Sequence, residues 1–298
     1  MQKISFKNSQ SGYVQSKPIE SASGIKKSEN VQKATRTISA FAPAVPILLL
    51  QNLFSKTALK KMFNVAKSFD PDEIKTLNAG ADEILKTKDL LNSLTIKNIT
   101  SKTNIGNYVR PPITAQALEQ VQEGFNAFFD SGNTIYVNKE IAPNLLFHEM
   151  GHAHNFKFSN FSRKMLRFYQ ASQIAPFIIA FSSLFMNEEK PKDGGELTKF
   201  QKIKNGFRKS LPFVAAASSL PMLLEEALAT NKANKWLGEL FDSNFVKKVS
   251  KSYKFGFLTY LTVPISAFLV SYLGMKYKDF LSSENKKNMP NSQSKTSA

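Results

Sequence analysis

Residues 145 to 155 read LLFHEMGHAHN, and this segment contains all three histidines of the 298-residue chain. Two of them, His148 and His152, flank Glu149 in the pattern HExxH. An α-helix advances about 100° per residue, so side chains four residues apart point the same way and two imidazoles at this spacing can bind one metal ion. In a zinc hydrolase the neighbouring glutamate takes a proton from the metal-bound water and delivers it to the leaving amine. The segment therefore predicts two zinc ligands, His148 and His152, with Glu149 as the general base.

The composition restricts the remaining metal ligand and the partners of the protein. The chain has no cysteine, which excludes thiolate ligands, disulfides and a cysteine nucleophile. It carries 40 Lys and Arg against 23 Asp and Glu, a net charge of +17 that suits nucleic acid or an anionic membrane surface. No nucleic-acid recognition motif is present, and the basic residues are spread over the whole sequence. We therefore expect membrane lipid, and no nucleic acid, as a partner.

Four uncharged, apolar stretches favour an integral, multi-pass membrane protein. The strongest is 255–275, which is as long as a transmembrane helix and has lysines on both flanks. The stretch 38–54 contains two prolines, so it is a possible short span, an interfacial anchor or a buried segment. The stretches 171–186 and 211–224 predict a hydrophobic helical hairpin, either in a membrane or in the core of a soluble protein.

The sequence outside these stretches predicts a mainly α fold with a small β-sheet, the α+β class. Helical patterns occupy 55–92 and 114–123, while 94–100 alternates apolar and polar residues as a half-buried strand does. A turn at 130–133 lies between two β-prone runs and predicts a hairpin or edge strand ahead of the HExxH helix. An exposed strand edge there could bind a substrate peptide in extended form.

The two polar ends of the chain are expected to be disordered. Residues 1–37 form a basic tail rich in Ser, Lys, Gln and Asn, without the apolar run of a signal peptide. Residues 276–298 form a second polar tail.

A third metal ligand must come from a carboxylate or from His154. His154 lies two residues beyond His152, about 200° around a helix, and so is expected to face away from the metal. The better candidates are Glu225 and Glu226, an acidic pair inside an apolar helix, because a buried carboxylate needs a partner such as a dication. The residues alone do not decide whether Glu225 or Glu226 is the third metal ligand. They also leave the alternative that neither is, and that both lie in an exposed helical turn.

Several elements follow one another over 124–236. They are Asn126-Ala127-Phe128, the strand 134–137, the HExxH helix, a hydrophobic hairpin and the sequence Glu226-Ala-Leu-Ala229. In this order they resemble the membrane-bound gluzincin endopeptidases of the HtpX and CAAX-prenyl-protease type. That family has an Asn-Ala-Phe element ahead of an edge strand, HExxH on one helix, and a glutamate ligand in an ExxAD pattern on another.

The resemblance implies a membrane-anchored zinc endopeptidase that acts on protein or peptide substrates. We expect its metallopeptidase domain to cover 55–250, beyond the part that the resemblance spans. The resemblance implies Glu226, rather than Glu225, as the third ligand of Zn²⁺, because only Glu226 is followed by an alanine at the family's position. It also implies substrate binding at the edge strand, near Asn126, Ala127 and Phe128. Thr230 stands where the family has an aspartate, and the support of a histidine ligand is altered if that aspartate orients one.

Two alternatives accompany this hypothesis. The first is a catalytically inactive membrane protein with a vestigial metal site, which acts through partner or anionic-lipid binding. The second is a soluble metallopeptidase with an unusually apolar helical core. Zinc content and activity separate the first from the enzyme, and behaviour without detergent separates the second.

Overall fold

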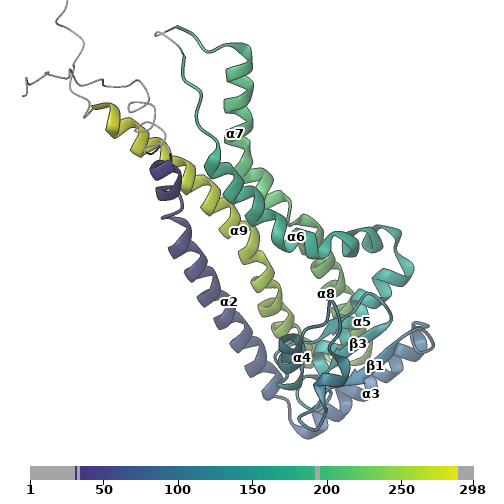
Figure 1. Cartoon of the computed structure of the whole chain (residues 1–298). Coiled ribbons are helices and arrows are strands. Elements are labelled where there is room, and N and C mark those ends of the chain that lie inside the picture. The colour runs from purple at the N-terminus through teal and green to yellow at the C-terminus, as the bar shows by residue number, and fades with distance from the viewer. Residues whose placement is uncertain (1–30, 32–33, 192–194, 288–298) are drawn as a thin grey trace, which may run out of the picture.

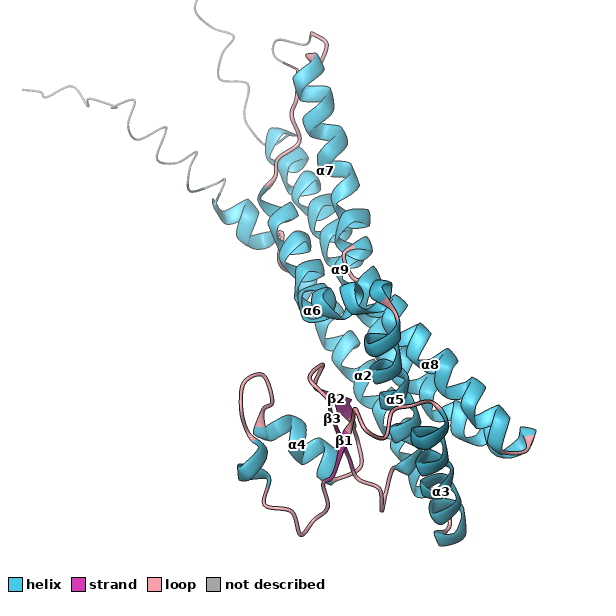
Figure 2. Cartoon of the chain, turned by 90° about the vertical axis from the view of Figure 1, so that its right-hand side faces the viewer, coloured by secondary structure: helices cyan, strands magenta, loops and turns pink. Residues whose placement is uncertain are grey.

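The computed structural model describes residues 31, 34–191 and 195–287. These residues form a mainly helical fold with a small three-stranded sheet, in agreement with the predicted α+β class. Long helices extend away from a smaller mixed part that contains the sheet and the HExxH helix (Figure 1). Figure 2 shows the sheet as a minor element at the edge of the helical assembly.

Five long helices build the extended part, and α9 contacts the other four. They are α2 (Ala44–Lys67), α6 (Asn160–Phe185), α7 (Lys199–Ala217), α8 (Leu220–Leu240) and α9 (Ser243–Lys287). One helix-packing cluster consists largely of small residues, among them Ala180, Ala215 and Ala267. Small side chains let helix backbones approach closely, as they do between membrane helices.

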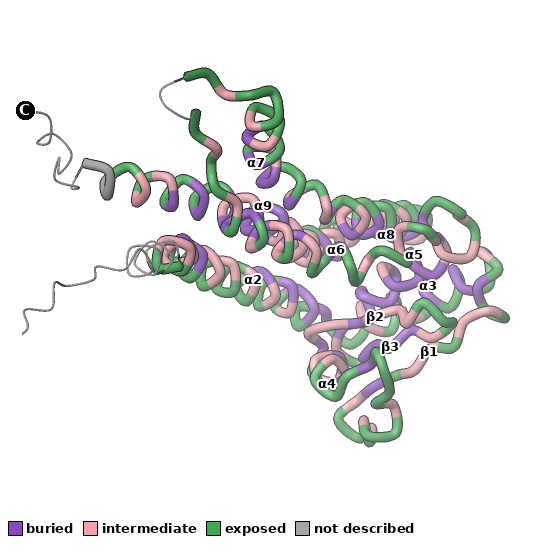
Figure 3. Tube along the Cα trace, turned by 45° about the horizontal axis from the view of Figure 1, so that its top comes forward, coloured by how far each residue is buried: buried purple, intermediate pink, exposed green. Residues whose placement is uncertain are grey.

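The outward faces of these helices are apolar. Leu49, Leu50 and Leu53 of α2 are 63 to 65% exposed, and similar residues lie on α6, α7 and α9. Figure 3 shows exposed positions along the length of α2 and α7. Among the described residues, four helical stretches are long and apolar enough to cross a membrane. They are Ala34–Lys67, Asn160–Phe185, Lys199–Leu240 and Ser243–Ser283. The structure is therefore compatible with a membrane protein.

Three helix boundaries differ from those expected. Helix α2 begins inside the apolar stretch 38–54, at Ala44, and continues beyond its end to Lys67. No proline or glycine lies between residues 55 and 67 to interrupt it. The stretch 171–186 is the second half of a longer helix, α6, which Ser159 caps at its start. The stretch 211–224 is divided between α7 and α8 at residues 218–219, just before Pro221, whose ring cannot continue a helical hydrogen-bond ladder.

The expectation of disordered ends is wrong where the structure describes them. Residues 34–37 are helical, and α9 continues through residues 276–287. Arg208 pairs with Asp279, and Lys278 donates to the carbonyl of Leu184, so these turns of α9 are held against α6 and α7. Residues 1–30, 32–33 and 288–298 lie outside the described part of the chain.

The mixed part begins with helix α3 (Pro71–Thr87), where Asp70 and Glu73 form a capping box. It continues through β1 (Thr95–Asn98), a 3₁₀ turn (Ile105–Tyr108) and α4 (Ala115–Gln122) to β2 (Phe128–Phe129) and β3 (Thr134–Val137). These elements confirm the strand within 94–100, the helix within 114–123 and the hairpin turn.

The sheet order is β1-β3-β2, with β1 parallel and β2 antiparallel to β3. The strand that precedes the HExxH helix, β3, is thus central, and β1 and β2 are the two edge strands, of which β2 carries Phe128. The hairpin forms because Asp130 accepts three backbone N–H groups within its own turn, from residues 132 to 134.

Candidate metal centre and its cleft

The HExxH segment forms helix α5 (Pro143–Phe158), which packs against α8. Gly151, inside the motif, is the point of closest approach, since a Cβ there would lie 2.6 Å from the carbonyl oxygen of Ala229. Glycine therefore lets α5 approach the backbone of α8 closely enough for side chains of the two helices to meet. This contact places Glu226, one turn before Ala229, opposite the two motif histidines.

His148, His152 and Glu226 form one cluster, in which a donor atom of each lies within 4.8 Å of the others. The Nε2 atoms of the histidines are 3.2 Å apart. One carboxylate oxygen of Glu226, Oε2, lies 3.1 Å from Nε2 of His148. The other, Oε1, lies 3.6 Å from Nε2 of His152. The sequence-predicted ligands are thus brought together, and the group could hold a metal ion.

The donor set fits a small tetrahedral cation. Ligand bonds of about 2.0–2.1 Å correspond to donor–donor separations of about 3.3 Å in a tetrahedron, close to the 3.2 Å between the two histidine nitrogens. With one oxygen of Glu226 as the third donor, all three atoms lie within 4.8 Å of one another. Two imidazole nitrogens and a carboxylate oxygen are also the ligand types that zinc accepts in catalytic sites.

Each histidine has a hydrogen-bond partner on its other ring nitrogen. Nδ1 of His152 lies 3.2 Å from a carboxylate oxygen of Glu225, which is also 3.2 Å from the side-chain amide of Asn155. Nδ1 of His148 lies 3.3 Å from the hydroxyl of Thr230. An ionised carboxylate can only accept, so Nδ1 of His152 carries a proton, and Nε2, on the side of the cluster, is the nitrogen that would bind a metal.

These contacts distinguish Glu225 from Glu226, the two candidates for the third metal ligand that the sequence alone did not separate. Glu226 faces the Nε2 atoms and Glu225 faces the opposite side of the His152 ring. Both acids are buried, so neither lies in an exposed helical turn. Thr230, one turn after Glu226, reaches Nδ1 of His148 through its hydroxyl.

The cluster is electrostatically suited to a cation. Burial lowers the pKa of His152, but Glu226, Glu225 and Glu149 outweigh that effect and raise this pKa to about 9. The surrounding carboxylates therefore favour a positive charge at the position of the imidazoles.

Glu149 lies beside the cluster and does not belong to the donor group. One of its oxygens accepts the backbone N–H of Phe129 in β2 at 2.8 Å. Burial raises the pKa of the Glu149 carboxyl, while the two histidines and this backbone hydrogen bond oppose the rise. A carboxylate with a raised pKa is a stronger base near neutral pH, which suits proton transfer.

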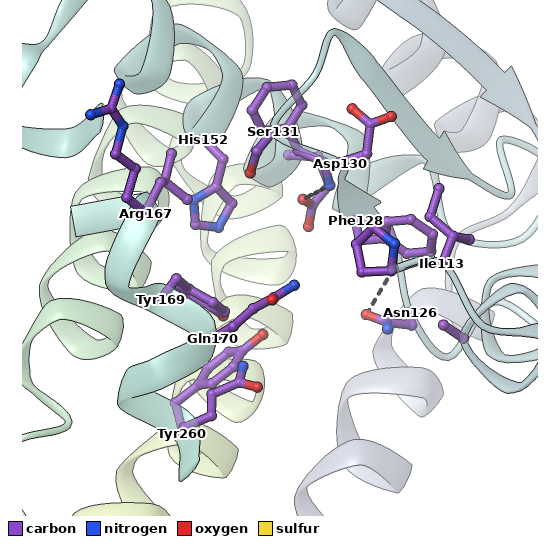
Figure 4. Close-up of a pocket in the computed structure, with 17 residues that line it drawn as sticks. Ile113, Asn126, Phe128, Asp130, Ser131, His152, Arg167, Tyr169, Gln170 and Tyr260 are labelled. Atoms are coloured by element: carbon purple, nitrogen blue, oxygen red, sulfur yellow. Dashed lines mark hydrogen bonds between the residues drawn. The ribbon is translucent and has the colours of Figure 1, made fainter. Parts of the chain in front are cut away.

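A cavity of about 600 Å³ opens next to Glu149 and His152. Asn126, Ala127 and Phe128 line it, so the three predicted substrate-binding residues lie beside the predicted base. Figure 4 shows Asn126 and Phe128 on one side of this cavity and Tyr169, Gln170 and Tyr260 on the other. The cavity therefore separates β2 from helices α6 and α9.

Two tyrosines of the site were not found by sequence reasoning. The hydroxyl of Tyr169, on α6, donates to Glu226, and Tyr260, on α9, lines the cavity. Both lie at the ends of apolar runs, where tyrosine is equally typical of a membrane boundary, so the sequence carried no separate signal for them.

His154 is a bystander, as predicted. Its ring packs against Phe158 and Trp236, and it lies outside the donor cluster. Burial and three nearby lysines lower its pKa to about 4, so the ring is neutral at physiological pH.

No protein-family model, curated protein or solved structure matches this chain.

Proposed function

We propose that this protein is a zinc-dependent, membrane-anchored endopeptidase of the gluzincin type. The observation that carries the proposal is the convergence of His148, His152 and Glu226 beside Glu149. Of these residues, His152 and Glu149 line a cavity bordered by the edge strand β2. The order of the motifs along 124–236, which resembles the HtpX and CAAX-prenyl-protease type, supports the same conclusion.

The residues of the site divide the work of peptide hydrolysis. His148, His152 and Glu226 would hold Zn²⁺, which supplies a Lewis acid and a water of lowered pKa. Glu149 accepts the proton of the attacking water on its carboxylate and delivers it to the leaving amine. Its hydrogen bond to Phe129 fixes the carboxylate at the strand edge, where a scissile amide would lie.

The edge strand is the proposed binding site for the substrate backbone. Asp130 donates its N–H to β3, so the N–H of the preceding residue, Phe129, points to the free edge and toward Glu149. A peptide added along β2 in extended form would pass next to Glu149. Tyr260, on the opposite wall, is the side chain that we propose to donate to the oxygen of the scissile carbonyl.

The surroundings of the site favour substrates with apolar segments. A second, smaller cavity of about 60 Å³ adjoins His148 and Glu149 and is lined by apolar residues of α2 and α9, including Leu59, Met62 and Phe257. It would accept an apolar side chain next to the cleaved bond. The proposed partners are accordingly a protein or peptide substrate and membrane lipid.

Replacement of Glu226 by alanine tests the ligand assignment and the activity together. We expect the variant to lose stoichiometric zinc, with affinity lower by more than about 100-fold, because a whole ligand is removed rather than its hydrogen-bond partner. Cleavage of a casein-type substrate should be lost in parallel. Zinc content by mass spectrometry and cleavage are measured on the same preparations.

The control for this experiment is Glu239→Ala, on the same helix. Glu239 forms a surface ion pair with Lys88 far from the cluster, so this variant should keep both zinc and activity. Wild-type protein that contains no zinc after careful purification would contradict the proposal and favour the inactive, lipid- or partner-binding alternative.

Membrane integration predicts how the protein fractionates. The exposed apolar faces of the long helices should keep it in the membrane pellet after alkaline carbonate washing, and detergent should be required to extract it. Monodisperse protein in the supernatant without detergent would support the soluble alternative instead.

A further inference from the structure

Glu225 is a fully buried acid whose role the proposed mechanism does not use. Its Oε1 atom accepts hydrogen bonds from Nδ1 of His152 and from the side-chain amide of Asn155, each at 3.2 Å. Its Oε2 atom has no hydrogen-bond partner among the described residues. A carboxylate in such a position is costly unless a nearby positive charge compensates it.

The ring of His152 lies between two successive glutamates of α8. Glu226 faces Nε2 at 3.6 Å, and Glu225 faces Nδ1 at 3.2 Å. Neighbouring residues of a helix point about 100° apart, so the two carboxylates reach opposite sides of one imidazole. Glu225 therefore fixes both the ring orientation and the position of the ring proton.

The two histidines are supported unequally. His148 has the neutral hydroxyl of Thr230 at Nδ1, whereas His152 has a carboxylate held in place by Asn155. A carboxylate partner makes the imidazole a stronger metal ligand than a hydroxyl does, because it stabilises the positive charge that the ring shares with the metal.

We propose that Glu225 is a positioning residue that supplies the metal site, through His152, with an anionic hydrogen-bond partner, which the neutral hydroxyl of Thr230 does not supply at His148. This inference rests on the proposed zinc site. It assigns to Glu225 a contribution to the affinity for a divalent cation, in addition to any role in joining α5 to α8.

The test uses full-length apoprotein in detergent, titrated with Zn²⁺ against a chelator and with Co²⁺ followed by its visible absorption. Glu225→Gln keeps the shape and the acceptor oxygen and removes only the charge. We expect this variant to bind both ions about 10- to 100-fold more weakly. The melting temperature of the apoprotein should fall, because Glu225 is one of the carboxylates that stabilise the charge of His152 when no metal is bound.

A charge swap separates this role from a merely structural one. The double variant Glu225→Gln/Thr230→Asp places a carboxylate next to the other histidine, His148, and should recover most of the lost metal affinity. Glu239→Gln, an exposed position of the same helix, is the control for the loss of a glutamate charge and should bind as the wild type does.

The outcomes distinguish this inference from the proposed function. Equal affinity of wild type and Glu225→Gln overturns the role of Glu225 and leaves the zinc site standing. A double variant no tighter than Glu225→Gln also overturns it, because the loss would then not reflect the missing anionic partner. Wild-type protein that binds neither ion overturns the proposed function itself.

Discussion

Replacement of Glu149 by glutamine should abolish peptide-bond cleavage and leave the metal in place. Glutamine has the shape of glutamate and retains an oxygen that can accept the N–H of Phe129, so the geometry at the strand edge is kept. It cannot take up a proton at neutral pH, and general-base catalysis is worth about 10²- to 10⁴-fold in rate. The metal donors are other side chains, so zinc binding should not change.

The measurement compares cleavage of a fluorescent protein substrate with zinc content for wild type and variant. Glu140→Gln, an exposed glutamate just before α5, is the matched control and should cleave normally. A Glu149→Gln variant that cleaves as fast as the wild type would contradict the assignment of the general base. Loss of zinc together with activity would show instead that Glu149 supports the metal.

The features that the sequence predicted well are those that depend on local interactions. The hairpin turn is determined by one side chain, Asp130, which bonds to the backbone of the next few residues. The HExxH spacing places its two histidines on one face of any helix.

The features that could not be predicted from the sequence depend on packing between distant segments of the chain. Glu225 and Glu226 have nearly the same sequence environment, and only the packing of α8 on α5 gives them different partners. Tyr169 and Tyr260 join the site from two further helices. The last turns of α9 read as a polar tail, but the pairing of Arg208 with Asp279 holds them in the helical assembly.

Substitution of Gly151 by alanine should have the largest effect on the architecture of the site. The new Cβ would lie 2.6 Å from the carbonyl oxygen of Ala229, a distance that real Cβ atoms essentially never show. That oxygen belongs to a helix backbone, so it cannot rotate away as a side chain does, and α5 and α8 must separate. Overpacking of this kind costs about 1–3 kcal/mol, whereas the gain in helix propensity from glycine to alanine is about 1 kcal/mol.

The same displacement would separate the histidines on α5 from Glu226 on α8. Misplacement of catalytic groups by about 1 Å can cost 10²-fold in rate, so we expect cleavage to fall by about that factor and metal affinity to fall with it. Thermal unfolding, metal titration and cleavage check the three effects.

Gly238→Ala provides the control, because a Cβ at Gly238, also on α8, would meet no atom within 4 Å. That variant should keep its metal and gain about 1 kcal/mol from helix propensity alone. The sign of the stability change should therefore be opposite in two chemically identical substitutions. If Gly151→Ala were also stabilising and bound zinc normally, close contact between α5 and α8 would not be what brings the ligands together.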